Sequence, residues 1–209
     1  QGDLRGADLS ELNLTFADLN GADLSFANLS GAILEDANLT NTKLVKANLK
    51  YVYAEKANFK NADFTNAYLR GINLSRANLE NATAFRADFS HALLDATILR
   101  SLMAQEASFD YALGNNVDFF AANLAGAWFY KAHLTDANFK STNLYNAKIQ
   151  SAILTKSSFE NANLAQSILR NSDLTQADFS NANLENANLQ GAKTIDTGWK
   201  NVNVTELHK

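Results

Sequence analysis

Residues 17–34 read ADLNGADLSFANLSGAIL, and this stretch shows the five-residue repeat that decides the fold. A bulky apolar residue stands at the centre of each repeat, and the register extends from Leu4 to Leu189 without an insertion or deletion. Of these 38 central positions, 34 are Leu, Phe or Ile. Two residues before each centre stands a small residue, which is Ala at 26 of the 37 positions from Ala7 to Ala187. Because so strict a period governs the whole fold, we interpret it before any short motif.

A period of five residues fits neither regular secondary structure. The apolar face of an α-helix recurs every 3.6 residues, and the faces of a strand alternate every two residues. The period does fit a chain that turns a corner every five residues, so that one apolar side chain from each segment points inward. Successive coils would then pair edge to edge at about 4.8 Å. The repeat therefore predicts a solenoid in which each coil contacts mainly its neighbours.

The A-(D/N)-L-x-x pattern resembles that of the pentapeptide-repeat proteins, which are numerous in cyanobacteria. It covers all but roughly the last 18 residues. The resemblance implies an all-β fold, a right-handed quadrilateral parallel β-helix with four repeats in each of about nine coils. It also implies a protein without catalytic activity, because most members have no assigned activity.

The residues alone leave the number of sides open. Asn recurs two places after the centre at intervals of twenty or a multiple of twenty, which suits four sides, at Asn41, Asn61, Asn81, Asn161 and Asn181. Another set of apolar residues recurs in multiples of fifteen, which suits three sides: Tyr53, Tyr68, Ile98, Leu113 and Trp128.

We expect one domain, a repeat β-helix over residues 1–192 followed by a C-terminal cap and tail over 193–209. Solenoids need atypical terminal caps, and we expect Ile195 and Trp199 to fold over the open end of the core. The chain begins at Gln1, already inside the repeat, which suggests a processed or trimmed protein. Thylakoid lumen or periplasm is the suspected location, with the cytoplasm as the alternative.

Exceptions to the repeat come in pairs that exchange volume. Ala54 is a small central residue, but Val52 is large where Ala is expected, and Leu102 precedes Ala104 in the same way. Such pairs keep the core near native packing density. Gly114 follows Ala112 without a local partner, so we expect the coils around residues 80–116 to be the narrowest or most irregular.

Composition argues against several classes of function. The net charge of −4 does not predict a surface that binds nucleic acid directly. The chain has no Cys, and its three His (His91, His133 and His208) are not spaced as metal ligands or as a base beside a nucleophile. Glu55 belongs to an acidic group that we expect Lys56 and Arg76 to neutralise. We therefore predict no enzyme, cofactor, metal site, small-molecule substrate or membrane span.

The best candidate for a functional surface is a stripe of apolar residues at positions that normally hold Asp or Asn. It comprises Ile33, Tyr53, Leu93, Leu113 and Ile153, interrupted by Asn73 and His133. Further outward aromatic residues are Phe85, Tyr111, Phe120, Trp128, Tyr130 and Tyr145. Exposed apolar patches often mark partner surfaces, although these side chains could instead only shield the backbone.

These observations predict a non-enzymatic scaffold that presents a surface to a protein partner or to another copy of itself. The alternative is a DNA mimic that binds DNA gyrase, as quinolone-resistance members of the family do. Those members resemble strongly negative dimeric rods, often with loops that break the repeat. This chain has a small net charge and an unbroken register, so the scaffold is the preferred interpretation.

Overall fold

Each segment of the chain lies beside the segment twenty residues later. Parallel bridges connect them from Asp3 with Asp23 to Asn188 with His208. The pairing lengthens into two short parallel strands, β1 (Leu113–Asn115) and β2 (His133–Thr135). Because twenty residues are four repeats, each coil has four sides, and the three-sided alternative is wrong.

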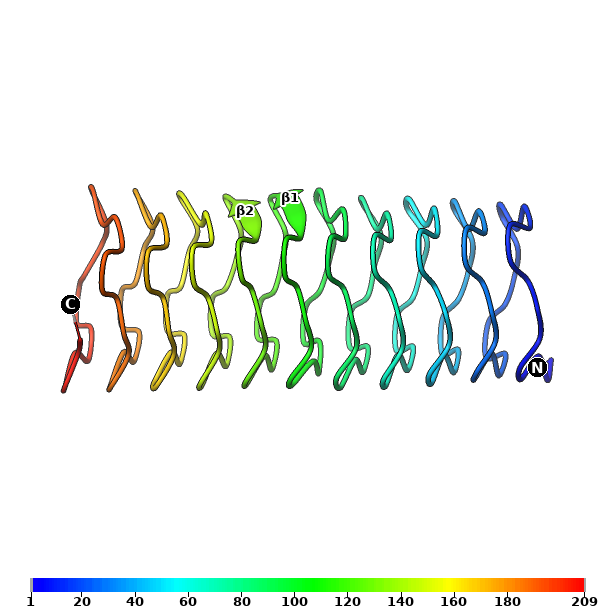
Figure 1. The fold of residues 1–209 in the computed structure, drawn as a ribbon, viewed down its shortest axis with the longest axis horizontal. Helices are drawn as coiled ribbons and strands as arrows, with labels where there is room; N and C mark the ends of the chain where they lie inside the picture. Colours follow the sequence, from blue (N-terminus) through cyan, green and yellow to red (C-terminus); the bar gives the residue numbers. More distant parts are fainter. Residues whose placement is uncertain (1, 209) are drawn as a thin grey trace.

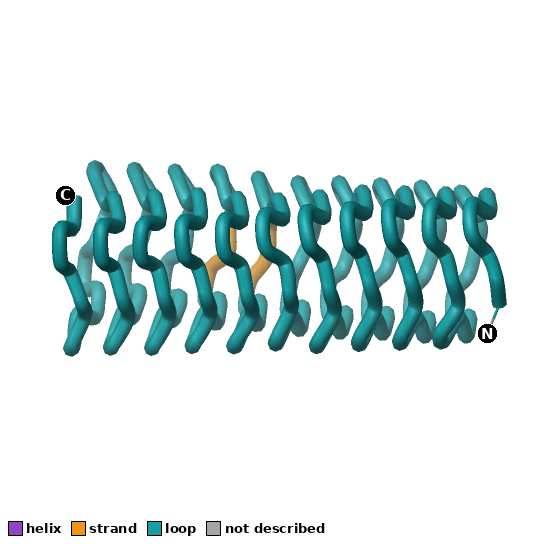
Figure 2. Tube along the Cα trace, turned by 90° about the horizontal axis from the view of Figure 1, so that it is seen from below, coloured by secondary structure: helices purple, strands orange, loops and turns teal. Residues whose placement is uncertain are grey.

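The molecule is a right-handed quadrilateral β-helix. The computed structural model describes residues 2–208 as a straight rod, with the two ends of the chain at opposite ends (Figures 1 and 2). At twenty residues per coil, the bridged residues 3–208 form about ten coils. We number its faces 1 to 4 after the first four central residues, Leu4, Leu9, Leu14 and Leu19, and name each corner after the two faces that it joins.

Backbone hydrogen bonds connect the coils and close the corners. Leu24 N–H donates to Lys43 C=O at 2.7 Å in the next coil. At the corner that follows, Ala27 N–H donates to Leu24 C=O at 3.0 Å, and Phe26 has a φ of 63°. This is a type II turn, whose third residue needs a left-handed backbone and favours Gly or Asn. The same requirement explains the recurrent Asn of the 4–1 corner, such as Asn41, whose φ is 57°.

Stacked apolar side chains fill the interior, as the repeat predicts. The central and small residues from the second coil to Leu189 are almost all buried, whereas those of the last coil are partly or largely exposed. On face 4, the rings of Phe119, Phe139, Phe159 and Phe179 stack with centroids 4.6–4.9 Å apart and nearly parallel planes. We call these four residues the aromatic ladder. Its spacing equals the distance between paired strands, so backbone pairing and ring stacking reinforce each other.

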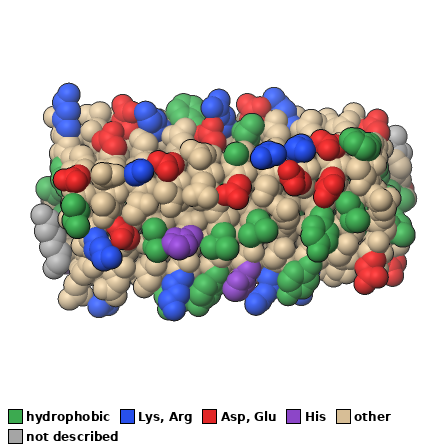
Figure 3. All heavy atoms as spheres, turned by 90° about the horizontal axis from the view of Figure 1, so that it is seen from above, with side chains coloured by type: hydrophobic (Ala, Val, Ile, Leu, Met, Phe, Trp, Pro, Cys, Tyr) green, Lys and Arg blue, Asp and Glu red, His purple; other side chains and the backbone are tan. Residues whose placement is uncertain are grey.

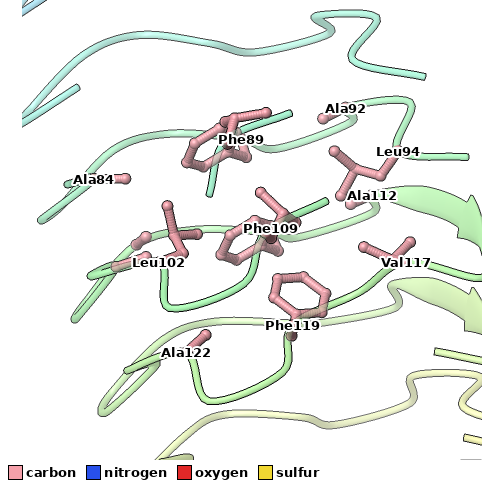
Figure 4. Packing of buried hydrophobic residues seen from close by; sticks show 14 of the residues in the cluster. Ala84, Phe89, Ala92, Leu94, Leu102, Phe109, Ala112, Val117, Phe119 and Ala122 are labelled. Atoms are coloured by element: carbon pink, nitrogen blue, oxygen red, sulfur yellow. The ribbon is translucent and has the colours of Figure 1, made fainter. Parts of the chain in front are cut away.

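The volume exchange around Gly114 involves a residue that the sequence interpretation missed. A Cβ atom at Gly114 would lie 2.8 Å from Val117 Cγ2 and 2.9 Å from the backbone of Leu94. Val117 is large at a position that normally holds Ala, and it occupies the space where a side chain at residue 114 would stand. Figure 4 shows Val117 on the same side of the core as Leu94. The expectation that Gly114 has no local partner is therefore wrong. The pairing departs from isolated bridges at β1, inside the predicted range of residues 80–116, and at β2, which lies beyond it.

The C-terminal segment continues the coil instead of folding across its end. Bridges pair Lys193 with Asp173 and His208 with Asn188 in the usual register, so the coil geometry passes the expected boundary at residue 193. Ile195 points outward from a corner and is 61% exposed, so its predicted capping role is wrong. Trp199 stacks on Phe179 at 5.1 Å and extends the aromatic ladder. Residue 209 lies outside the described residues.

The Asp or Asn before each centre stabilises the corner that follows, as predicted. Asp178 Oδ1, for example, accepts hydrogen bonds from Ser180 N–H at 2.9 Å and from Ser180 Oγ–H at 2.6 Å. Hydrogen bonds from Ser or Thr hydroxyls lower the pKa of several such carboxyls, namely Asp8, Asp23, Asp173 and Asp178. Hydrogen bonds from backbone N–H groups make a smaller contribution in the same direction. The side chain of Arg5 lowers the pKa of Asp3 to about 2.

Acid is therefore expected to destabilise the rod as the pH falls from about 4 to about 2. In that window the unfolded chain binds more protons than the folded chain, because the folded pKa values are depressed. Thermal unfolding followed by circular dichroism at several pH values measures this loss. The variant Asp173→Asn with Asp178→Asn keeps both acceptor oxygens and should lose less stability in acid. An equal loss of stability in the two proteins would show that Asp173 and Asp178 do not cause the acid sensitivity.

Candidate protein-interaction surface

The predicted apolar stripe is a continuous row along face 3. Parallel bridges join each of its members to the next, and we call the row the apolar ladder: Ile33, Tyr53, Asn73, Leu93, Leu113, His133 and Ile153. Tyr53, Leu93 and Leu113 are 54%, 41% and 47% exposed. Figure 3 shows this row of apolar side chains along one face of the rod. The sequence stripe therefore forms one surface.

Apolar residues in this row remove a hydrogen bond that the repeat normally makes. Where Asp or Asn precedes the centre, its side chain accepts the N–H of the corner residue two places later. Leu113 cannot do so, and Asn115 N–H donates instead to Asp95 Oδ1 of the neighbouring coil at 2.8 Å. An apolar residue at this position exposes apolar surface and lacks the turn acceptor that Asp or Asn provides, so it does not serve the stability of the corner.

A second row lies beside the apolar ladder, at the 2–3 corner. We call it the corner row: Tyr51, His91, Tyr111 and Lys131. Each of these residues has a left-handed backbone, with φ between 53° and 58°. The His91 and Tyr111 rings stack at 5.0 Å, and Tyr130 packs edge-on against Tyr111 at 5.6 Å. Lys131 Nζ lies 5.2 Å from the centre of the Tyr130 ring.

Sequence reasoning missed most of the corner row. From the sequence, His91 is considered only as a histidine without catalytic or metal-binding spacing, and neither Tyr51 nor Lys131 is singled out. Each of the three stands two residues before a member of the apolar ladder. The Tyr51 ring covers Gly71, where an added Cβ would lie 2.7 Å from a ring carbon. Together the two rows form what we call the apolar face.

The remaining candidate residues lie elsewhere. Trp128 on face 2 and Tyr145 at the 1–2 corner line the same shallow hollow, together with Arg86 and Glu106. Phe85 is half-buried at that corner, under the Arg86 guanidinium at 4.8 Å. Phe120 lies at the 4–1 corner, diagonally opposite the corner row, because it is ten residues, or half a coil, from Tyr130. These four aromatic residues do not join the apolar face.

Charged residues of opposite sign border the apolar face (Figure 3). The 3–4 corner is mainly acidic, with Glu35, Asp36, Glu55, Asp95, Asp136 and Asp196 against Lys56, Arg76 and Lys156. The 2–3 corner is mainly basic, with Lys50, Arg70, Lys131 and Arg170 against Glu11 and Asp110. Partial burial raises the pKa of Asp110, and a bond from Tyr130 N–H at 2.7 Å offsets part of that rise.

Within residues 2–208, no three His, Cys, Asp or Glu side chains gather as metal ligands. Glu55 lies 3.6 Å from Arg76 and 3.8 Å from Lys56, which neutralise it as predicted. The lysines of the third coil are distributed around the rod and do not form a basic patch, with Lys43 on face 1 and one lysine at each corner: Lys46, Lys50, Lys56 and Lys60. No helix in the described part of the chain could cross a membrane.

The fold and this surface define a four-sided solenoid with one apolar face, and comparison with known proteins names its family. The model of the pentapeptide repeats matches eight copies, over residues 1–25, 22–61, 62–100, 118–155 and 157–193. The chain belongs to the pentapeptide-repeat family. The unmatched residues 101–117 contain Leu102, Ala104 and Gly114, where the repeat departs most from its pattern.

Solved structures of other pentapeptide-repeat proteins resemble this chain. HetL of the cyanobacterium Nostoc sp., a protein involved in heterocyst differentiation regulation, is 27% identical over 95% of this chain and 87% of its own, with a TM-score of 0.55. Rfr23 of the cyanobacterium Cyanothece is 24% identical over 63% and 90%, with a TM-score of 0.46. The fluoroquinolone resistance protein QnrB1 is 20% identical over 72% and 86%, with a TM-score of 0.36. No curated protein matches the chain.

Proposed function

We propose that this protein is a non-enzymatic scaffold that binds a protein through its apolar face. The observation that supports the proposal most strongly is the continuous row on face 3, in which five of seven side chains are apolar, at positions where the repeat often uses Asp or Asn. Apolar patches of this kind mark protein-interaction sites, and exposed Tyr is enriched at interfaces. Face 1 carries a run of Asn, namely Asn143, Asn163 and Asn183, whose amides bond one another. Exposed apolar residues at the equivalent positions of the faces other than face 3 stand singly, as Tyr68, Ile98 and Met103 do.

The rod offers a partner a rigid template. Each coil is bonded to the next on all four faces, so the apolar side chains stand at fixed intervals of about 4.8 Å. A preorganised surface binds with little loss of conformational entropy. The scaffold can therefore act by positioning a partner, without chemistry of its own.

Charge distribution favours this function over mimicry of DNA. A DNA mimic needs a continuous negative surface, whereas acidic side chains here alternate with basic ones. Lys60 pairs with Glu80, Arg86 with Glu106 and Lys140 with Glu160, each at 2.7–2.8 Å. A supercoiling assay with DNA gyrase tests the alternative, and inhibition or protection of the enzyme at micromolar protein would favour it.

The double variant Tyr53→Asp with Leu113→Asp tests the proposal. We expect it to fold normally, because Asp is a residue that the repeat itself uses at this position and restores the turn acceptor. It should lose both self-association and recovery of bound protein, since each Asp places a charge in an apolar contact. Gel filtration and affinity capture measure the two effects.

A matched control places the same charges on the opposite face, with Thr83→Asp and Asn123→Asp at equivalent positions of face 1. This control should bind as the unmodified protein does. If Tyr53→Asp with Leu113→Asp leaves both oligomeric state and partner recovery unaltered, the apolar face has no role in binding.

The suspected location in the thylakoid lumen or periplasm stays a prediction. The N-terminal residues of the full-length precursor test it. A signal peptide would place the protein in one of these compartments, whereas a repeat that continues to the initiator Met would favour the cytoplasm.

A further inference from the structure

We propose that the apolar face binds a second copy of this chain, with the two rods parallel and related by a two-fold axis that runs along them. This inference rests on the proposed function, because it names the partner of the same surface. Two features carry it: the opposite charges of the two borders, and a hollow that matches a projection on the same coils.

Symmetry allows two ways to place the apolar faces of two copies together. If the two-fold axis crosses the rods, the copies are antiparallel and each corner meets the same corner of the other copy. If the axis runs along the rods, the copies are parallel, and the 2–3 corner of one meets the 3–4 corner of the other at the same coil. Only the second arrangement brings the basic border against the acidic border.

Individual charges of opposite sign meet in two coils of the parallel arrangement. Lys131 faces Asp136 of the second copy, because the two residues belong to one coil. Lys50 faces Glu55 in the same way, but Glu55 also lies near Lys56 and Arg76 of its own chain, so this second pair contributes less. Neither Lys131 nor Asp136 has an ion-pair partner within its own chain over residues 2–208. Arg70 meets a like charge, that of Arg76. Complementary charges of this kind fix the register and orientation of an interface.

The apolar faces of the two copies are also complementary in shape in the middle coils. Beside the 3–4 corner lies a surface hollow of about 380 Å³, with the backbone of Gly114 among its lining residues. Its walls come from the apolar ladder and the acidic corner: Leu93, Leu113, His133, Asp95, Asn115 and Thr135. Beside the 2–3 corner of the same coils project the stacked rings of His91 and Tyr111. In the parallel arrangement the projection of each copy meets the hollow of the other, twice by symmetry.

The area is sufficient for a weak dimer. The apolar ladder spans six coil steps of about 4.8 Å, or ~29 Å, and a face of five residues is ~16 Å wide. Each copy thus buries on the order of 500 Å², which brings the total near the ~1,000 Å² of the smallest specific interfaces. We therefore expect a dimer that forms at micromolar or higher concentrations.

Sedimentation of the whole chain over a range of concentrations tests the charge matching. Lys131→Glu and Asp136→Lys should each weaken dimerisation by about tenfold, because each creates two like-charge contacts in a symmetric dimer. Combined in one chain, the two changes should restore the affinity. If the unmodified protein stays monomeric at submillimolar concentration, or if the combined variant is as weak as the single ones, the proposal is overturned.

Introduced cysteines test the orientation, because the chain has none of its own. Ile33→Cys and Ile153→Cys, at opposite ends of the apolar ladder, should each form disulfide-linked dimers alone in the parallel arrangement. Antiparallel copies would instead cross-link when the two variants are mixed, and this result would overturn the proposal. Thr83→Cys on face 1 is the matched control and should cross-link slowly.

The outcomes separate this inference from the proposed function. A chain that remains monomeric, yet loses another bound protein when Tyr53→Asp and Leu113→Asp are introduced, would overturn the dimer and retain the scaffold. A chain that neither dimerises nor loses a bound protein would overturn both.

Discussion

Phe139→Ala is expected to lower the free energy of unfolding by about 3–5 kcal/mol. Phe139 is almost completely buried, and its ring stacks on Phe119 at 4.8 Å and on Phe159 at 4.9 Å. Alanine would leave a cavity in the middle of the aromatic ladder, and the surrounding coils cannot collapse into it because backbone hydrogen bonds hold their spacing. Chemical denaturation followed by circular dichroism measures the loss.

Phe139→Leu is the matched control for this experiment. Leucine occupies most other central positions and keeps much of the apolar volume, so its cost should be clearly smaller. Equal losses for the two substitutions would show that ring stacking, and not the volume of the side chain, determines stability in the ladder. No loss for alanine would contradict the assignment of the core.

Leu102→Ala should cost about 2–5 kcal/mol. Leu102 is completely buried beside Phe109, one coil from Ala84 on the same side of the core (Figure 4). Ala84 and Ala104 are both small central residues, so Leu102 supplies apolar volume that they lack. The midpoint of chemical denaturation measures the effect, and a midpoint equal to that of the unmodified protein would refute the exchange of volume.

A compensating variant makes the test of Leu102 specific. Leu102→Ala combined with Ala104→Leu recreates the ordinary Ala-x-Leu order of the repeat, with the large side chain at the central position. This double variant should recover most of the lost stability. If it is no more stable than Leu102→Ala alone, the two positions do not share one space.

Three features could be predicted from the residues: the corner at every fifth residue, the buried core, and the Asp and Asn side chains that accept hydrogen bonds in the turns. Each depends on contacts within one repeat or with the next one. The four-sided coil needed the family resemblance. Residues such as Asn41 and Asn61, which show the interval of twenty, lie on the surface, where few positions are constrained. Val117 was missed because its partner Gly114 belongs to the preceding repeat, and the two meet only across a corner.

The prediction for the C-terminal segment was wrong because the residue types there differ from those of the repeat. Thr194 and Gly198 do not fit the repeat, so the segment was interpreted as a cap, yet backbone pairing with the preceding coil maintains the register. The apolar ladder could be predicted because its members replace Asp or Asn. The corner row could not, since Tyr51 and His91 occupy corner positions that accept almost any side chain.

Backbone pairing between residues twenty places apart limits how such a protein can change during evolution. A substitution alters which side chain stands at a given height on a face, but not the height itself. An inserted or deleted single repeat would move every later residue to the adjacent face and separate the halves of the apolar ladder. The smallest change in length that preserves all four faces is one whole coil, so the rod can lengthen or shorten only in units of about 4.8 Å.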